Sequence, residues 1–227
     1  IRRVKQHSDL GITFLPTPAD KLRVVCHSDA VFANVGDYTQ AGFVVGFTPD
    51  ELDKGHNAPW TPAIWRSHRL SRAVGSTLGA EAQSMVSATG KLVWASLILS
   101  EALDGPFDVR TYEAVLRRRP PVVVTDCKSL FDHRLVSVSA PTAVEDRRTS
   151  IDIVILRQSM PRVHASVRWV PTDCMLADSL TKNAGDPTDL LRACIKEGRY
   201  QISPEATVLK MQQKEKQRIL EKRTNSN

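Results

Sequence analysis

The chain has 227 residues, of which 41% are hydrophobic and 25% charged, a composition typical of one globular domain or of a domain with appendages. Its longest apolar run, "LVWASLIL", is far shorter than the roughly 20 residues that a membrane span needs, so we expect no membrane partner. The net charge of +6 suggests an anionic partner only weakly, because residues 208–227 alone hold six Lys or Arg against two Glu.

The four cysteines form no CxxC pair, which argues against a zinc site and favours free thiols. Free thiols are typical of an intracellular protein, in the cytoplasm or the nucleus.

The first third of the chain has the pattern of three antiparallel strands. "KLRVVCHSDAVFA" (21–33) and "AGFVVGFT" (41–48) are apolar runs joined by a polar turn, which predicts a hairpin. "AIWRSHRL" (63–70) alternates apolar and polar residues, as a half-exposed strand does.

Helical spacing of small and apolar residues then predicts a helix from Gly79 to Leu103, capped by Ser76 or Thr77. After a short helix in "TYEAVLRRR", the run "VVVTD" (122–126) predicts a buried strand. The remaining predicted elements are helices in "SLFDHRLVS", "RRTSIDIVILRQSM", "PTDCMLADSLTK" and 187–198, and a strand in "RVHASVRWV".

This order of elements predicts an α+β sheet with helices packed on it. The strands at 22–31 and 122–126 would be central neighbours. If they are parallel, Asp29 and Asp126 come to neighbouring positions on one edge of the sheet.

Four carboxylates stand at unusual places in these elements: Asp29 interrupts a strand, Glu81 lies at the small-residue start of a helix, Asp126 ends a buried strand, and Asp178 lies on a helix that should be packed. Each alone is typical of a cap or a surface charge. Clustered carboxylates, in contrast, cannot all stay ionised without a counter-charge, and a pair of magnesium ions would supply one together with phosphoryl-transfer chemistry.

The motifs "HSDAVFA", "QAGFVVGF", "STLGAEA", "VVVTDCKSL", "RRTSIDI" and "VRWVPTDCMLADSLTK" resemble the ribonuclease H domain of copia-type (Pseudoviridae) retrotransposon polyproteins. The resemblance implies an α+β, ribonuclease H-like fold: a five-stranded mixed sheet with three antiparallel strands first and helices packed on both faces. It implies a linker from a preceding reverse transcriptase at residues 1–21, the domain at 22–200 and a charged tail at 201–227.

The same resemblance implies that Asp29, Glu81, Asp126 and Asp178 bind two Mg²⁺ ions, or Mn²⁺ in their place, and are the catalytic residues. The substrate would be an RNA–DNA hybrid whose RNA strand is hydrolysed during reverse transcription. The reverse transcriptase region of the same polyprotein would be a partner, and a virus-like particle would be an alternative location.

The sequence departs from related proteins at two places. Ser150 stands where the family commonly has a His before the Ile-Asp-Ile stretch, and Thr172 and Asp173 stand where cellular ribonucleases H carry a loop His. We therefore expect weaker proton shuttling, or shuttling by Asp173.

Three further residues are candidates for nucleic-acid contact. Lys128 could touch a phosphate, and the hydroxyls of Ser76 and Thr77 could contact the backbone or a 2′-hydroxyl, although helix capping explains both hydroxyls equally well. Two other functions stay open: a catalytically inactive ribonuclease H-like module that acts as a nucleic-acid or protein scaffold, and a nuclease of the same fold that acts on DNA.

Overall fold

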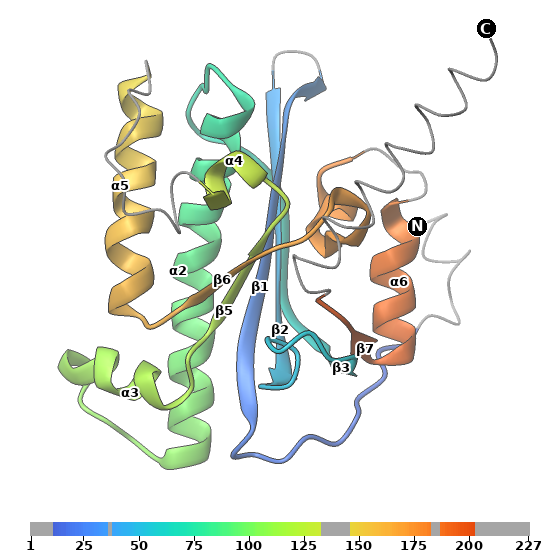
Figure 1. Cartoon of the computed structure of the whole chain (residues 1–227), viewed down its shortest axis with the longest axis vertical. Helices are drawn as coiled ribbons and strands as arrows, with labels where there is room; N and C mark the ends of the chain where they lie inside the picture. Colours follow the sequence, from blue (N-terminus) through green and yellow to red (C-terminus); the bar gives the residue numbers. More distant parts are fainter. Residues whose placement is uncertain (1–10, 36–37, 133–145, 183–186, 203–227) are drawn as a thin grey trace, which may run out of the picture.

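The computed structural model describes residues 11–35, 38–132, 146–182 and 187–202. These residues form a five-stranded mixed sheet in the order β4-β2-β1-β5-β6 and a two-stranded sheet of β3 and β7 (Figure 1). The strands are β1 Leu22–Val35, β2 Tyr38–Pro49, β3 Ala58–Pro59, β4 Thr61–Arg69, β5 Val122–Thr125, β6 Ser166–Trp169 and β7 Arg199–Tyr200. The α-helices are α2 Thr77–Asp104, α3 Tyr112–Arg118, α4 Lys128–Leu130, α5 Arg147–Arg162 and α6 Pro187–Glu197, and the 3₁₀ helices are η1 Val109–Thr111, η3 Thr172–Cys174 and η4 Leu176–Leu180.

Strand β1 is the central strand of the sheet. It pairs antiparallel with β2 on one side and parallel with β5 on the other. His27 of β1 lies opposite Val124 of β5, so Asp29 and Asp126, each two residues further along, follow at the same level of the sheet. The two strands are central neighbours, as predicted, and they are parallel, which is the condition for Asp29 and Asp126 to meet.

Helices α2 and α5 cover one face of the sheet (Figure 1). Alternate residues of β1, such as Val24 and Cys26, point into the core on this side. The side chains of α2 and α5 that fill it include Met85, Leu92, Leu99, Ile153 and Leu156. As predicted, Ser76 caps α2: its hydroxyl oxygen accepts a hydrogen bond of 3.1 Å from the backbone N–H of Gly79.

By length and composition, α2 is the one helix of the described residues that could cross a membrane, a property that core helices of soluble proteins share. One side of this helix is buried against the sheet and α5 from Gly79 to Ser100, whereas Trp94 and Ile98 are exposed. Packing in the core explains the apolar residues on the buried side of α2 but not the exposed Trp94, Ile98 and Leu103.

The other face of the sheet carries η4, α6 and the β3–β7 pair (Figure 1). Its core includes Val25, Val44, Leu52, Trp60, Val124, Leu176, Tyr200 and Ile202. Because both faces are covered, the predicted α+β class with a five-stranded mixed sheet and helices on both faces is confirmed.

The predicted α-helix in residues 171–182 is wrong. This segment consists of η3 and η4, two short 3₁₀ helices whose backbone hydrogen bonds span three residues, as from Thr181 N to Asp178 O at 3.2 Å. Side chains three residues apart are eclipsed in a 3₁₀ helix, so Asp178 and Thr181 lie on the same side of η4. The 3₁₀ geometry thus turns both polar side chains toward the sheet edge.

The other predicted elements agree with the structure in type, with one partial exception. The segment "SLFDHRLVS" begins with the short helix α4 and a further turn at residues 131–132, and its part from residue 133 lies outside the described residues. The predicted helix at 187–198 corresponds to α6.

The boundaries of the predicted linker, domain and tail stay predictions. Of the linker, residues 11–21 are described, and the backbone N–H of Thr13 donates a hydrogen bond of 3.0 Å to the carbonyl of Ile195 in α6. Of the tail, only residues 201 and 202 are described, and Ile202 is buried in the core beneath η4 and α6.

His27 is a fully buried histidine on the η4 face of β1. Its ring lies edge-on to Tyr200, with centroids 5.0 Å apart, and neither ring nitrogen has a hydrogen-bond partner. Burial lowers the pKa of His27 from 6.5 to about 3. The folded chain therefore holds this imidazole neutral at pH values where the unfolded chain protonates it.

We predict that lowering the pH from 8 to 5 reduces the free energy of unfolding of the wild type by about 2 kcal/mol more than that of His27→Leu. Acid protonates His27 in the unfolded chain, where its pKa is near 6.5, before it protonates the folded chain, and so it favours unfolding. Urea unfolding of both proteins at the two pH values measures the difference. An identical pH dependence of the two proteins would contradict the buried, neutral histidine.

Candidate active site

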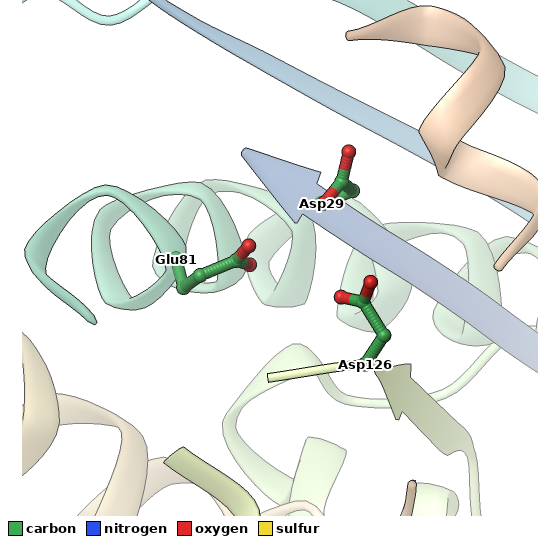
Figure 2. Close-up of side chains that lie close together, drawn as sticks. All are labelled: Asp29, Glu81 and Asp126. Carbon is green, nitrogen blue, oxygen red and sulfur yellow. The ribbon is translucent and has the colours of Figure 1, made fainter. Parts of the chain in front are cut away.

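Three acidic side chains converge in the middle of the sheet, at the level where β5 ends. Asp29 comes from β1, Glu81 from the first turns of α2, and Asp126 from the residue directly after β5 (Figure 2). One carboxylate oxygen of each lies within 4.8 Å of those of the other two. The parallel pairing of β1 and β5 brings the two aspartates together, and α2 begins at the same end of the sheet, so that Glu81 in its first turns joins them.

Hydrogen bonds between α2 and β1 position Glu81. Its Oε1 accepts a hydrogen bond of 3.3 Å from the backbone N–H of Ala30. One turn further along α2, the hydroxyl of Ser84 donates to the carbonyl of Asp29 at 3.0 Å and accepts from the hydroxyl of Ser28 at 3.0 Å. Because Ser84 is buried, these bonds fix the height of α2 over the strand at the level of the acidic cluster.

Helix α5 fixes the start of α2 from its other side. Arg72, which precedes α2, makes two hydrogen bonds of 2.7 Å to the buried carboxylate of Asp152 in α5. A Cβ on Gly79 would lie 2.6 Å from Oγ1 of Thr149, so glycine lets the two helices approach at this point. The position of Glu81, two residues later, depends on this contact.

Asp29 is held by the segment after η4. The hydroxyl of Thr181 donates a short hydrogen bond to Oδ2 of Asp29. The opposing residue on β2 is Gly42, where a Cβ would lie 2.7 Å from Cβ of Leu180 and 3.0 Å from Cγ2 of Thr181. A glycine at this position therefore allows η4 to approach closely enough for the Thr181 hydroxyl to reach Asp29.

Asp126 is held through both its backbone and its side chain. The indole N–H of Trp169 donates a hydrogen bond of 3.0 Å to the carbonyl of Asp126, and the side chain of Thr172 hydrogen-bonds to its carboxylate. Each aspartate of the cluster thus has its own threonine partner, Thr181 for Asp29 and Thr172 for Asp126.

Asp178 adjoins the cluster without being one of its three close members. Its side chain is buried, with 7% of its area exposed, and its Oδ1 lies 2.5 Å from Nζ of Lys182. The hydroxyl of Thr181 that donates to Asp29 lies 3.1 Å from the carbonyl of Asp178, and the charge of Asp178 raises the pKa of both Asp29 and Asp126. Of the four carboxylates expected to converge, the structure brings three into direct proximity and sets the fourth beside them, paired with a lysine.

Burial and mutual repulsion oppose ionisation of the cluster. Burial is the largest cause that raises the pKa of Asp29, to about 6, and the neighbouring Asp126 and Asp178 add to it. Burial also raises the pKa of Asp126, and burial together with the charges of Asp29 and Asp126 raises the pKa of Glu81 well above its ordinary value. A cation bound among these oxygens would relieve the repulsion and favour the ionised form.

The donor atoms suit a hard divalent cation. All of the ligand atoms that the cluster offers are carboxylate oxygens, which magnesium and manganese prefer. Oε2 of Glu81 is buried and has no hydrogen-bond partner. An unsatisfied buried carboxylate oxygen is costly, and coordination to a metal ion would satisfy it. The residues present therefore fit Mg²⁺ or Mn²⁺.

The three residues predicted to contact nucleic acid lie around the site with other interactions already in place. Ser76 and Thr77 are exposed at the start of α2, where Ser76 also serves as the cap. Nζ of Lys128 lies 2.7 Å from Oδ1 of Asp132 and about 5 Å from the ring centroids of Phe131 and Trp169. Contact of these residues with a nucleic acid stays a prediction.

Sequence reasoning missed the polar residues that orient the carboxylates. Ser84 follows Glu81 by three residues, and a buried serine at that spacing on an otherwise apolar helix face was the available signal. Thr181 and Lys182 belong to the motif "ADSLTK". Their contacts with Asp29 and Asp178 depend on the 3₁₀ geometry of η4, which the sequence did not reveal.

No protein-family model matches the chain, and no curated protein matches its sequence significantly. Solved structures with a similar arrangement include the N-terminal RNase H domain of rv2228c from Mycobacterium tuberculosis, with 14% identity, a TM-score of 0.44, and coverage of 78% of this chain and 98% of that one. RNase H1 from Halobacterium salinarum has 17% identity and a TM-score of 0.42, with coverage of 70% and 93%. LC11-RNase H1, solved in complex with an RNA/DNA hybrid, has 15% identity and a TM-score of 0.44, with coverage of 70% and 93%. Because the identities and TM-scores are this low, the chemistry of the site is interpreted from its own residues.

We predict that Asp29→Asn stabilises the metal-free protein at pH 8 by about 2 kcal/mol more than it does at pH 4. The folded chain holds a proton on Asp29 more tightly than the unfolded chain, because burial raises its pKa to about 6. The wild type therefore loses stability as the pH rises from 4 through 6, whereas asparagine has no charge to gain. Urea unfolding in the presence of a chelator measures the effect, and a stability difference that does not change with pH would contradict it.

Proposed function

We propose that the chain is a metal-dependent ribonuclease H that hydrolyses the RNA strand of RNA–DNA hybrids. The observation that carries the proposal is the convergence of Asp29, Glu81 and Asp126, with one oxygen of each within 4.8 Å of the others. Two buried carboxylates and the half-buried one of Asp126, all with pKa values raised by burial, form a site for divalent cations. Such cations are the usual catalysts of phosphodiester hydrolysis.

In this proposal Asp29, Glu81 and Asp126 hold the first ion, and Asp178 together with Asp29 completes the site for a second. Mg²⁺ is the proposed ion and Mn²⁺ its substitute. When bound, the ions supply positive charge to the attacking and the departing oxygen of the phosphodiester.

The chain's own polar groups keep the carboxylates in place for this task. The hydroxyl of Thr181 fixes the rotamer of Asp29, and the side chain of Thr172 fixes that of Asp126. Asp173, which is exposed beside Thr172, is the proposed group for proton transfer to and from solvent, where cellular ribonucleases H use a histidine.

The start of α2 and the region of α4 are the proposed contacts for the hybrid. Ser76 lies five residues before Glu81, roughly 8 Å along the helix axis, and Thr77 lies beside it, so their hydroxyls could reach a backbone or a 2′-hydroxyl next to the cleaved bond. Lys128, two residues after Asp126, is the proposed phosphate contact.

The sequence motifs support a biological context for this activity. We infer that the domain acts during reverse transcription of a copia-type retrotransposon, with a reverse transcriptase region of the same polyprotein as its partner. The proposed location is intracellular, in the cytoplasm, the nucleus or a virus-like particle.

The decisive test is cleavage of a labelled RNA–DNA hybrid in the presence of Mg²⁺ by the wild type and by Asp126→Asn. We expect the wild type to cut the RNA strand and the substitution to lower the rate at least about 100-fold, because it removes one of three charged ligands. Asp20→Asn is a matched control, since it removes an exposed carboxylate at the start of β1, the end remote from the site, and should keep the wild-type rate.

Cleavage by Asp126→Asn at the wild-type rate would rule out the proposed mechanism. Failure of the folded wild type to cut the hybrid with either Mg²⁺ or Mn²⁺ would rule out the enzyme and favour the scaffold. Cutting of duplex DNA in preference to the hybrid would instead favour a DNA nuclease.

A further inference from the structure

An ion pair between Asp178 and Lys182 lies beside the acidic cluster of Asp29, Glu81 and Asp126. Oδ1 of Asp178 and Nζ of Lys182 are 2.5 Å apart, and the two residues are four positions apart in sequence. The backbone around them is fixed, because the N–H of Lys182 and the N–H of Thr181 both donate to the carbonyl of Asp178, at 3.1 and 3.2 Å. The backbone of Lys182, two residues after the end of η4, is therefore fixed next to Asp178.

The positive charge of Lys182 acts on more than its direct partner. It lowers the pKa of Asp29 and of Asp126, opposing the effect of burial. On the opposite side of the cluster, Glu81 is more than nine-tenths buried, and its Oε2 has no hydrogen-bond partner. Oδ1 of Asp178 is likewise buried without a hydrogen-bond partner. The two sides differ in charge, because the oxygen of Asp178 has the ammonium group of Lys182 beside it.

The side chain of Lys182 can swing away from Asp178 into the solvent. With 37% of its area exposed, it reaches the cluster from the solvent, and its flexible four-carbon stem allows the ammonium to move into water. Asp178, with 7% exposed, cannot follow it. A divalent ion binds a carboxylate oxygen at about 2.1 Å, so the ion and the ammonium would contend for the same side of Asp178.

We propose that Lys182 is a tethered cation that competes with the second divalent ion for Asp178, so that the site fills in a fixed order. The first ion binds among Asp29, Glu81 and Asp126 while Lys182 neutralises Asp178. The second ion binds only when it displaces the ammonium into solvent. Lys182 therefore sets the concentration of Mg²⁺ at which the two-ion state forms. This inference rests on the proposed metal site and adds to it a residue that regulates occupancy.

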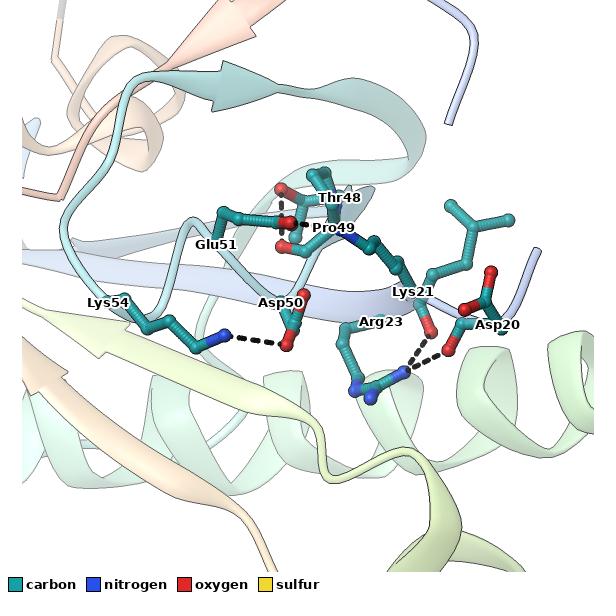
Figure 3. Close-up of polar contacts among 9 residues, drawn as sticks. Asp20, Lys21, Arg23, Thr48, Pro49, Asp50, Glu51 and Lys54 are labelled. Carbon is teal, nitrogen blue, oxygen red and sulfur yellow. Dashed lines mark hydrogen bonds and ion pairs between the residues drawn. The ribbon is translucent and has the colours of Figure 1, made fainter. Parts of the chain in front are cut away.

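The chain offers a matched control for the loss of this charge. Lys54 pairs with Asp50 at 2.8 Å, also four positions apart, in the polar network at the start of β1 (Figure 3). The end of β2 next to Asp50 pairs with Leu22, seven residues before Asp29 and thus roughly 23 Å from it along the strand. Lys54→Met removes an equivalent exposed charge without changing the field at the cluster.

The test is a titration of the full-length protein with Mn²⁺, followed by calorimetry and by the electron paramagnetic resonance signal of free Mn²⁺, with no substrate present. We expect the wild type to bind one ion and then a second more weakly. In Lys182→Met the second ion should bind on the order of tenfold more tightly, because a positive charge within a few ångströms has been removed. Lys182→Arg and Lys54→Met should both keep the wild-type pattern.

Any other result of the Mn²⁺ titration would contradict either the competition by Lys182 or the metal site itself. Two-ion binding by Lys182→Met with wild-type affinity at both steps would overturn the competition by Lys182 and leave the metal site intact. Weaker binding of the second ion by Lys182→Met would show that the lysine supports the ion. Absence of Mn²⁺ binding by the wild type itself would overturn the proposed metal site, and with it the proposed function.

Discussion

Repulsion between buried carboxylates is the constraint on which the rest of this structure depends. Asp29, Glu81 and Asp126 lie close together, and burial raises the pKa of each. Several buried hydrogen bonds hold these residues in position. Such an arrangement is unfavourable for folding and is retained by proteins at functional sites. The hydrogen bonds of Ser84, Thr181 and Thr172 leave the carboxylates little freedom to move apart, so protonation or a bound cation must relieve the repulsion.

The architecture explains how distant parts of the chain meet at this point. Parallel pairing of β1 with β5 aligns two strand positions at one end of the sheet, and the long helix α2 begins at the same end and packs along one face. On the other face, η4 approaches β2 over Gly42, the position where a side chain would collide with it. The site is thus built from both layers that cover the sheet, and each layer contributes one acidic residue, Glu81 from α2 and Asp178 from η4.

Much of the fold could be predicted from the sequence because its elements have clear periodicities. The apolar runs of β1 and β5 and the small residues of α2 each specify one element, and the parallel pairing of the central strands then aligns Asp29 with Asp126. The segment 171–182 could not be predicted in the same way, because its 3₁₀ geometry results from packing against Gly42 and from the hydroxyl of Thr181, both of which are tertiary contacts. For the same reason the pairing of Asp178 with Lys182 was not visible before the structure, although spacing alone allows it in any helix. Charge and composition gave no information about the geometry of the site.

The central claim is that the three carboxylates form a site for a divalent cation, and the most direct test is a crystal structure of the protein grown with Mn²⁺ and measured at the manganese absorption edge. The account predicts an anomalous difference peak at the edge of the sheet, within coordination distance of oxygens of Asp29, Glu81 and Asp126. Occupied Mn²⁺ sites elsewhere on the protein with no peak between these three side chains would contradict it.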